Sequence, residues 1–368
     1  MSILLLFVSI SSFTQSDALK KSNQKTRIGS ILYVGGTGPG NFTYIQDAID
    51  NSSEGDTIFV YSSIYYENIN IKRYGINLIG EDKDNTIIDG GGISSVIQID
   101  LENSHVNING FTIQNAGGKY WNYSGIEIFS SHNNISGNII RNNPQTGIWI
   151  DNYYMANSNN INENIIIYNE FGIFLDYTDL NSIYDNNISN NRVGIFVGYS
   201  VLPSSNEFTF LSCETLDSMD YENYIYRNTV KNNEIGIEIE GWPFLDVFEN
   251  IISENDIGIL LRSPYLVRCR FNNIYKNNII NNYYGVYFSE WYERSDVKFN
   301  KFYRNNFINN TFNLHGDCNY YNKWKRNYWD DWIGLDYKIL RFLPYLIYNV
   351  SYKNIDWRPV LEPYDISI

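Results

Sequence analysis

Cysteine, histidine and methionine are scarce in this sequence, with three residues of each type among 368. Cys213, Cys269 and Cys318 form neither a C-x-x-C pair nor a zinc-ligand spacing, so no metal site is predicted from them. Two alternatives remain for these thiols. Either one disulfide forms, with Cys213–Cys269 as the first pair to test, or all three cysteines are unpaired.

Positive charge is also in short supply. The 27 Lys and Arg residues are outnumbered by 41 Asp and Glu residues, which gives a formal net charge of −14. This balance disfavours nucleic acid, whose phosphates need basic partners, and it disfavours an anionic membrane surface. A polyanionic sugar would be repelled as well, unless a cation such as calcium bridged it to the protein.

Long apolar runs are missing. The apolar run Ile3–Ile10 falls short of the roughly 20 residues that a membrane-spanning helix needs. We interpret residues 1–19 as a signal peptide, with a buried first strand as the alternative. Because no later segment is long and apolar enough to be an anchor, the sequence predicts a secreted or cell-surface extracellular protein, in which residues 20–56 form a linker and an N-terminal cap.

What the sequence does contain is an internal repeat, a Gly followed by alternating apolar residues. The copies are GIEI at Gly125, GIWI at Gly147, GIFL at Gly172, GIFV at Gly194, GIEI at Gly236, GILL at Gly258 and GVYF at Gly285. Successive glycines are 22, 25, 22, 42, 22 and 27 residues apart, so the value of 42 corresponds to one 22-residue coil with 20 inserted residues. Such a period is typical of a solenoid built by stacking.

An Asn-x-apolar-x-x-Asn unit keeps a fixed phase with these glycines. In five repeats the first Asn lies eight residues before the Gly and the second lies three before it: Asn164–Asn169, Asn186–Asn191, Asn228–Asn233, Asn250–Asn255 and Asn277–Asn282. A high content of Asn cannot by itself produce this constant spacing between Asn and the repeated Gly. We expect the Asn before each Gly to occupy a tight turn, because Asn tolerates left-handed backbone, and stacked amides to form a hydrogen-bonded ladder.

The alternation predicts short strands that pair in parallel with the next coil and bury their apolar sides together. One inward column is predicted at Ile148, Ile173, Ile195, Ile237, Ile259 and Val286, and another at Ile166, Ile188, Val230, Ile252 and Ile279. The sequence therefore predicts an all-β, single-stranded right-handed parallel β-helix over residues 57–314, with an insertion at 198–223.

Both ends of such a solenoid need caps. At the front, a short helix with Thr43 as N-cap is predicted from the helical spacing of Tyr44, Ile45, Ala48 and Ile49. At the back, residues 315–368 should form an aromatic C-terminal cap. Its aromatic residues are Tyr328, Trp329, Trp332, Tyr337, Phe342, Tyr345, Tyr348 and Trp357.

Several motifs carry a resemblance to a known group of proteins. They are YVGGTGPGNFTYIQDAID (Tyr33–Asp50), GDTIFVY (Gly55–Tyr61), INLIGED (Ile76–Asp82) and NYWDDW (Asn327–Trp332). With the repeats, they resemble the extracellular β-helix repeat proteins of the archaeal type, which are grouped with NosD-like copper-maturation proteins and with the carbohydrate-binding and sugar-hydrolysis repeat of pectin-lyase-like folds. The resemblance implies the fold and leaves the activity open, because this fold hosts lyases, hydrolases, epimerases and non-catalytic surface proteins.

Candidate site residues lie two and four positions after each Gly, where side chains should point outward. The first outward column reads Glu127, Trp149, Phe174, Phe196, Glu238, Leu260 and Tyr287, and the second reads Phe129, Asp151, Asp176, Gly198, Glu240, Arg262 and Ser289. Trp149, Phe174 and Phe196 would form an aromatic strip. Because aromatic rings stack on sugars and carboxylates bind hydroxyls or a bridging cation, we predict a monomer that binds a polysaccharide or cell-surface glycan without catalysis. A loop that covers the strip as ordinary core is the alternative.

Two further functions remain open. In a carbohydrate-active enzyme, Asp151 and Asp176 would be the candidate catalytic acids, about 5 Å apart as in retaining glycosidases, although parallel stacking gives any neighbouring acids that spacing. The resemblance also implies a NosD-like copper role, which needs soft or imidazole ligands. The candidates, which recur at no common coil position, are His105, His132, His315, Met155, Met219 and the three cysteines.

Overall fold

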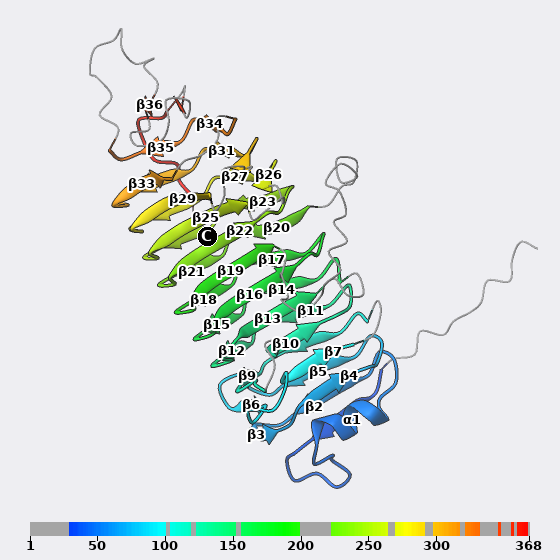
Figure 1. The fold of residues 1–368 in the computed structure, drawn as a ribbon. Coiled ribbons are helices and arrows are strands. Elements are labelled where there is room, and N and C mark those ends of the chain that lie inside the picture. The colour runs from blue at the N-terminus through cyan, green and yellow to red at the C-terminus, as the bar shows by residue number, and fades with distance from the viewer. Residues whose placement is uncertain are drawn as a thin grey trace, which may run out of the picture.

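The protein is a right-handed parallel β-solenoid of about ten turns, seen in a computed structural model. The structure describes residues 29–100, 104–118, 123–151, 156–198, 222–263, 269–290, 297–316, 321–331, 345–346, 355–356 and 359–366. Successive coils stack into a rod, with the first coils and the one helix among the described residues at one end (Figure 1). The predicted fold class is therefore confirmed.

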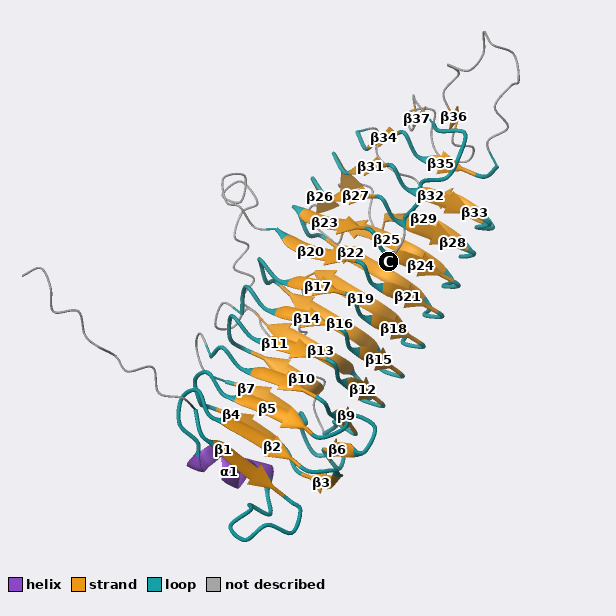
Figure 2. Cartoon of the chain, turned by 180° about the vertical axis from the view of Figure 1, so that it is seen from behind, coloured by secondary structure: helices purple, strands orange, loops and turns teal. Residues whose placement is uncertain are grey.

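Three parallel sheets form the walls of the rod (Figure 2). The 14-stranded sheet contains, in spatial order, β1 (Ile31–Val34), β2 (Thr57–Val60), β5 (Asn77–Gly80), β8 (Asn107–Asn109), β11 (Asn134–Ser136), β14 (Asn160–Asn162), β17 (Ser182–Tyr184), β20 (Asn223–Tyr226), β23 (Leu245–Phe248), β27 (Asn273–Tyr275), β31 (Lys301–Tyr303), β34 (Lys323–Lys325), β37 (Ile355–Asp356) and β36 (Tyr345–Leu346). The last two strands pair antiparallel, and the other described pairs in this sheet are parallel.

The other two walls follow the same order along the rod. The 11-stranded sheet contains β3 (Ser63–Tyr66), β6 (Thr86–Asp89), β9 (Thr112–Gln114), β12 (Ile139–Arg141), β15 (Ile165–Ile167), β18 (Asn187–Ser189), β21 (Thr229–Lys231), β24 (Ile251–Ser253), β28 (Asn278–Ile280), β32 (Asn306–Ile308) and β35 (Tyr328–Trp329). The ten-stranded sheet contains β4 (Ile69–Ile71), β7 (Ile97–Ile99), β10 (Ser124–Ile128), β13 (Thr146–Asp151), β16 (Phe171–Asp176), β19 (Val193–Gly198), β22 (Ile235–Glu240), β25 (Ile257–Ser263), β29 (Tyr284–Glu290) and β33 (Phe312–His315). A two-stranded sheet joins β26 (Cys269–Arg270) to β30 (Val297–Lys298).

Both predicted inward columns are confirmed. The column through Ile148, Ile173 and Ile195 is in register between neighbouring strands and fully buried, and so is the column through Ile166 and Ile188. A third inward column on the 14-stranded sheet contains Ile108, Ile135, Ile161, Ile183, Ile225, Val247, Ile274, Phe302 and Trp324. Each buried aliphatic side chain contributes about 1.5–3 kcal/mol, so the stacked columns supply most of the stabilising burial.

The predicted ladder of stacked amides is present at each corner of the coil. Asn186 donates from Nδ2 to Oδ1 of Asn228 at 3.0 Å, and Asn228 does the same to Asn250 at 3.0 Å. One ladder contains Asn138, Asn164, Asn186, Asn228, Asn250, Asn277, Asn305 and Asn327, and a second contains Asn143, Asn169, Asn191, Asn233, Asn255, Asn282 and Asn310. Sequence analysis missed the third, which contains Asn133, Asn159, Asn181 and Asn223, is interrupted at Leu245, and continues through Asn272, Asn300 and Asn322.

The expected position of the left-handed backbone is wrong by one residue. In the second ladder, which holds the Asn nearest each Gly, the preceding residue has the positive φ, as at Tyr168 (58°), Asn190 (56°) and Glu254 (57°), whereas the ladder Asn itself does not. The corner therefore needs two neighbouring residues with different tasks. The first turns the chain, and the Asn that follows uses its side chain to pair the buried backbone groups of the turn.

The front cap is a helix, as predicted, but Thr43 is not its N-cap. Helix α1 (Ile45–Asn51) begins after Tyr44, which forms no side-chain capping bond. Instead the carboxylate of Glu67, on the next coil, accepts the backbone N–H groups of Ile45 (2.8 Å) and Gln46 (3.0 Å). An acid at this position also suits the positive end of the helix, which contacts β1, β2 and β4.

At the other end the coils continue past Leu314, since β34 and β35 extend two of the sheets. Aromatic rings fill the core there: Trp329 stacks on Phe307 with centroids 4.2 Å apart, and Trp324 stacks on Phe302 at 4.0 Å. Buried Asp356 ends the first Asn ladder by accepting Asn327 Nδ2 at 3.0 Å. Residues 1–19, most of the predicted insertion and several cap aromatics (Trp332, Tyr337, Phe342, Tyr348 and Trp357) lie outside the described residues.

Candidate functional site

The two predicted outward columns lie on the outer face of the ten-stranded sheet. Strand pairing places Glu127 opposite Trp149, Trp149 opposite Phe174, and Phe174 opposite Phe196. The column continues in register through Glu238, Leu260 and Tyr287. Asp151 and Asp176 are direct neighbours in the second column. The repeat phase thus placed every one of these residues correctly along the rod.

The exposure of the aromatic strip differs from the open surface that the sequence predicts. Trp149 and Phe196 are each only 6 % exposed, whereas Phe174 and Tyr287 are half-buried. Phe196 packs with Val193, Ile235 and Leu260 in a cluster separate from the solenoid core, and Phe171, Phe174, Ile257 and Tyr287 pack against that cluster. The open aromatic surface of this face is therefore provided by the half-buried rings rather than by Trp149.

The ring geometry on this face is mixed. Phe174 meets Phe196 edge to face, with centroids 4.7 Å apart and an interplanar angle of 80°. Trp149 is nearly parallel to Phe174 at 6.1 Å. The buried indole N–H of Trp149 has no hydrogen-bond partner among the described residues. Because this nitrogen is shielded from solvent, it is not open to a ligand in this structure.

Glu127 lies at the N-terminal end of the strip and is almost fully buried. Its Oε2 accepts hydrogen bonds from Ser95 Oγ (2.9 Å) and Gln98 Nε2 (3.1 Å). Burial raises the pKa of Glu127 to about 7, and the neighbouring carboxylates of Asp151 and Asp100 add to the rise, while the two hydrogen bonds oppose it. Near neutral pH this carboxyl can therefore hold or release a proton.

A charged group lies at the C-terminal end of the strip. The guanidinium of Arg262 forms ion pairs with Glu238, which is fully buried, and with Glu240, whose Oε2 is 2.7 Å from Nε. Burial lowers the pKa of Arg262 to about 10, so it stays charged at neutral pH. Burial also raises the pKa of Glu240, although the nearby cation favours its ionised form. Two acids and one base thus form a compact, mostly buried cluster.

The predicted catalytic acids do not assemble into a metal site. Asp151 is half-buried and Asp176 is buried, on neighbouring strands. Within the described ranges, no three His, Cys, Asp or Glu side chains are grouped so that they could hold a metal ion. A calcium-dependent arrangement therefore has no support from the described acids, and the face instead offers separate carboxyl groups beside aromatic rings.

One prediction about histidine is wrong. His105 and His132 share a coil position, with parallel rings whose centroids are 4.8 Å apart. Parallel imidazoles do not converge on a common ion, so this pair is a stack rather than a ligand set. Cys269 is a buried free thiol, which excludes the Cys213–Cys269 disulfide; Cys213, Cys318, Met155 and Met219 lie outside the described residues. The described donors therefore do not fit a copper site, and we derive no copper chemistry.

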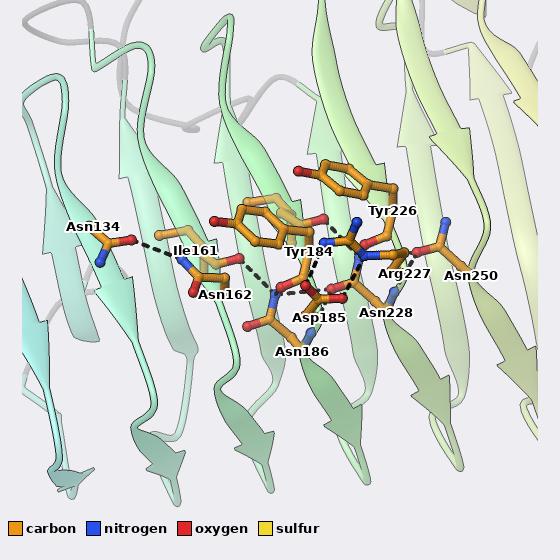
Figure 3. Close-up of polar contacts among 11 residues, drawn as sticks. Asn134, Ile161, Asn162, Tyr184, Asp185, Asn186, Tyr226, Arg227, Asn228 and Asn250 are labelled. Carbon is orange, nitrogen blue, oxygen red and sulfur yellow. Dashed lines mark hydrogen bonds and ion pairs between the residues drawn. The ribbon is translucent and has the colours of Figure 1, made fainter. Parts of the chain in front are cut away.

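Sequence analysis missed an aromatic column on the 14-stranded sheet. Tyr184 and Tyr226 stack with centroids 5.0 Å apart, and the stack continues through Phe248, Tyr275 and Tyr303. Figure 3 shows the first two rings beside an ion pair in which Arg227 Nε and Nη2 reach the Asp185 carboxylate at 2.8 and 2.6 Å. The signal was present in the repeat, since each ring lies two residues before an Asn of the first ladder. Because these ring faces cover one another, they are not open to sugars.

Solved structures with a similar fold include several carbohydrate-related proteins. The complex of XylC with xylose aligns at a TM-score of 0.55 with 12% identity, over 81% of this chain and 83% of XylC. The A-module of the Azotobacter vinelandii mannuronan C-5 epimerase AlgE4 aligns at 0.50 with 13% identity, over 79% and 99%. The tailspike gp49 of the Acinetobacter baumannii bacteriophage Fri1, a capsular polysaccharide depolymerase, aligns at 0.50 with 9% identity, over 85% and 58%. At such low sequence identity, these structural alignments show a shared fold alone.

Family models give a more direct assignment. No curated protein sequence matches the chain significantly. Residues 204–334 match the model of the periplasmic copper-binding protein NosD. Residues 48–214 and 95–264 match the model of the right-handed β-helix region, and together they span more than half of the chain. None of the described helices is long and apolar enough to cross a membrane. This chain belongs to the right-handed β-helix family.

Proposed function

We propose that this protein binds a glycan, without catalysis, on the outer face of its ten-stranded sheet. The observation that carries the proposal is the outward column itself. Half-buried aromatic rings at Phe174 and Tyr287 lie on the same face as the half-buried carboxyl of Asp151, and the mostly buried carboxyl of Glu127 lies one coil before Asp151. Apolar ring surface beside hydrogen-bonding carboxyls matches the two faces of a sugar.

The shape of the column supports a polymeric ligand. Consecutive coils repeat at the strand spacing of about 4.8 Å, so equivalent side chains are presented at regular steps along one line. A polysaccharide lying parallel to the rod would meet one outward side chain of each column per coil.

The relatives support the same class of ligand and a location outside the cytoplasm. The similar structures include proteins described with xylose, as a mannuronan epimerase and as a capsular polysaccharide depolymerase. The matching NosD model is described as periplasmic. We propose that the protein acts outside the cytoplasm, as a secreted or cell-surface β-helix that works as a monomer.

A carbohydrate-active enzyme is the second candidate, and Glu127 favours it. A carboxyl whose pKa is about 7 is suited to act as a general acid near neutral pH, and Asp151 is close enough to raise that pKa. The described residues offer no basic group beside Glu127 that an elimination reaction would use. We therefore rank hydrolysis or simple binding ahead of lyase chemistry.

A glycan array with the purified protein, with and without calcium, tests the proposal. Product analysis on each glycan that binds then separates binding from catalysis. Binding without turnover supports the proposal, and turnover that disappears in Glu127→Gln supports the enzyme. No binding and no turnover across neutral and charged polymers would remove both sugar-based functions.

A further inference from the structure

The last coils of the 14-stranded sheet carry a basic surface that is unexpected in a chain with a net charge of −14. Five exposed cationic side chains lie there, and we call them the basic wall: Lys301, Arg304, Lys323, Lys325 and Arg326. Strand pairing places Lys301 beside Lys323, and the left-handed corner residues Arg304 and Arg326 follow the same two strands. Strands β31 and β34 bear this surface, and β27 lies next to β31, so the three strands are consecutive along the rod (Figure 1).

The sign of the charge changes along this wall. Segments 271–276, 299–304 and 321–326, each a corner, strand and corner of one coil, contain no Asp or Glu. The equivalent segments of the four preceding coils contain Glu163, Asp185, Glu222, Asp246 and Glu249. Among the described residues, the side chains of the basic wall form no ion pair within 4 Å, whereas Lys276, one coil earlier, is paired with Glu249 at 2.8 Å. The cations of the last coils are thus concentrated on one wall of the rod.

Acids border the basic wall on two sides. Asp246, on β23 of the same sheet, interacts electrostatically with Lys301, and the hydroxyl of Tyr364 in the C-terminal segment donates to the carbonyl oxygen of Arg326 at 2.8 Å. Asp356 is buried and bound to the backbone N–H groups of Arg326 (3.0 Å) and Asn327 (2.8 Å). The exposed acids Glu362 and Asp365 belong to the segment 359–366, which is fixed to the 11-stranded sheet by bonds between Tyr364 and Asn306. At physiological salt, charges more than about 8 Å away are largely screened, so the overall negative charge does not cancel this local patch.

A column of aromatic rings borders the basic wall at the opposite corner of the same strands. We call Phe244, Phe271, Phe299 and Tyr321 the aromatic corner. Their centroids are 5.4, 5.5 and 5.3 Å apart in sequence order, so the ring faces cover one another and the edges point away from the rod. Phe271 is 37% and Tyr321 is 55% exposed. Only one residue, Asn322, separates Tyr321 from Lys323, so apolar edges and cations form one continuous surface.

We infer that this surface docks the protein onto an anionic lipid bilayer. Cations beside aromatic side chains are the combination that proteins use at membrane interfaces, where Lys and Arg meet lipid phosphates and rings enter the headgroup region. The ring geometry favours a bilayer over an anionic polysaccharide, because a sugar stacks on an open ring face and both faces of Phe271 and Phe299 are covered by neighbouring rings. Ring edges, in contrast, enter a bilayer interface without losing their stacking. The side of the rod thus lies on the membrane, and this inference is independent of the proposed glycan site.

Cosedimentation with vesicles tests the inference. The full chain is mixed with vesicles of phosphatidylcholine alone or of phosphatidylcholine with phosphatidylglycerol, at low and at high salt. We expect binding only to the anionic vesicles and release at high salt, because screening weakens the attraction. Since each Lys or Arg at a membrane contributes about fivefold in affinity, the double variant Lys301→Gln/Lys323→Gln should weaken binding about 20-fold or more.

Matched variants keep the result interpretable. Lys83→Gln/Lys231→Gln removes the same charge from half-buried lysines in other parts of the rod and should bind anionic vesicles as the unchanged protein does. Tyr321→Ser should weaken vesicle binding while its salt dependence is retained, and circular dichroism confirms that each variant is folded. Three results would overturn the inference: equal binding to neutral vesicles, equal losses in both double variants, or binding to soluble dextran sulfate without binding to vesicles.

Discussion

Replacing Asn228 by Ala removes one rung from the middle of a buried Asn ladder. The Asn228 Oδ1 atom accepts the backbone N–H and the side-chain Nδ2 of Asn186, both at 3.0 Å. Its Nδ2 atom donates to the carbonyl oxygens of Ile183 (2.8 Å) and Tyr226 (3.0 Å) and to Oδ1 of Asn250 (3.0 Å). Asn228 is fully buried, so water cannot replace these bonds without entering the rod.

The expected loss follows from the groups left behind. At least two buried backbone groups, the N–H of Asn186 and the carbonyl of Ile183, lose a partner at about 1–3 kcal/mol each, so Asn228→Ala should lower the free energy of unfolding by about 3–5 kcal/mol. Asn187 is the matched control, because it is exposed and directly follows a ladder residue. Asn187→Ala should change the stability by less than about 0.5 kcal/mol.

Urea unfolding followed by circular dichroism measures both variants. Because each coil of a solenoid contacts mainly its neighbours, native-state hydrogen exchange should accompany it. The Asn186 amide should exchange much faster in Asn228→Ala, while amides near the N-terminal helix should change less. If both variants unfold alike and the Asn186 amide stays protected, the ladder is not a major source of stability.

Three further predictions concern buried ionisable groups. The pKa of Glu127 is raised from 4.5 to about 7, so the folded state holds this proton more tightly than the unfolded state and loses stability as the pH rises from 4.5 to 7. Glu127→Gln should therefore stabilise the protein by up to about 3 kcal/mol at pH 8 and change its stability little at pH 4. Urea titrations at both pH values measure this difference. Arg262→Met leaves Glu238 as a buried charge without its cation and should cost about 3–5 kcal/mol at neutral pH, with a smaller loss in acid in the same assay. Burial raises the pKa of Cys269, so alkylation and peptide mapping should find its thiol unreactive until urea unfolds the chain; labelling in the native state would contradict its place in the core.

The repeat phase made much of this fold predictable. A 22-residue period with alternating apolar residues is sufficient to place Ile173 and Ile188 inside, because stacking aligns equivalent positions in every coil. The third Asn ladder was not predicted, because a constant spacing to the Gly was recognised only for the two Asn residues nearest to it. Asn159 and Asn181 nevertheless lie five residues before the first-ladder Asn of their coils. The left-handed position was missed because several residue types, such as Arg227 and Glu249, occupy it.

The candidate site was predictable in position and not in exposure. The outward column is a consequence of period and alternation, so Trp149 and Phe174 were placed correctly. How much of each ring is buried depends on side chains that pack across coils, such as Val193 and Ile235 around Phe196, and a local pattern does not contain that information. The basic wall was hidden for a similar reason, since total charge says nothing about the distribution of charge along a rod.

Affinity measurements on two single variants test the proposed glycan site most directly. A glycan selected on the array is titrated calorimetrically against the unchanged protein, Phe174→Ala and Tyr226→Ala, with circular dichroism to confirm folding. Phe174 lies on the proposed binding face, whereas Tyr226 lies in the closed stack of another wall. We predict that Phe174→Ala weakens binding by about tenfold or more, or about 1.4 kcal/mol, and that Tyr226→Ala leaves the affinity unchanged. Equal affinities in all three proteins, or a loss only in Tyr226→Ala, would contradict the assignment of the site to the ten-stranded sheet.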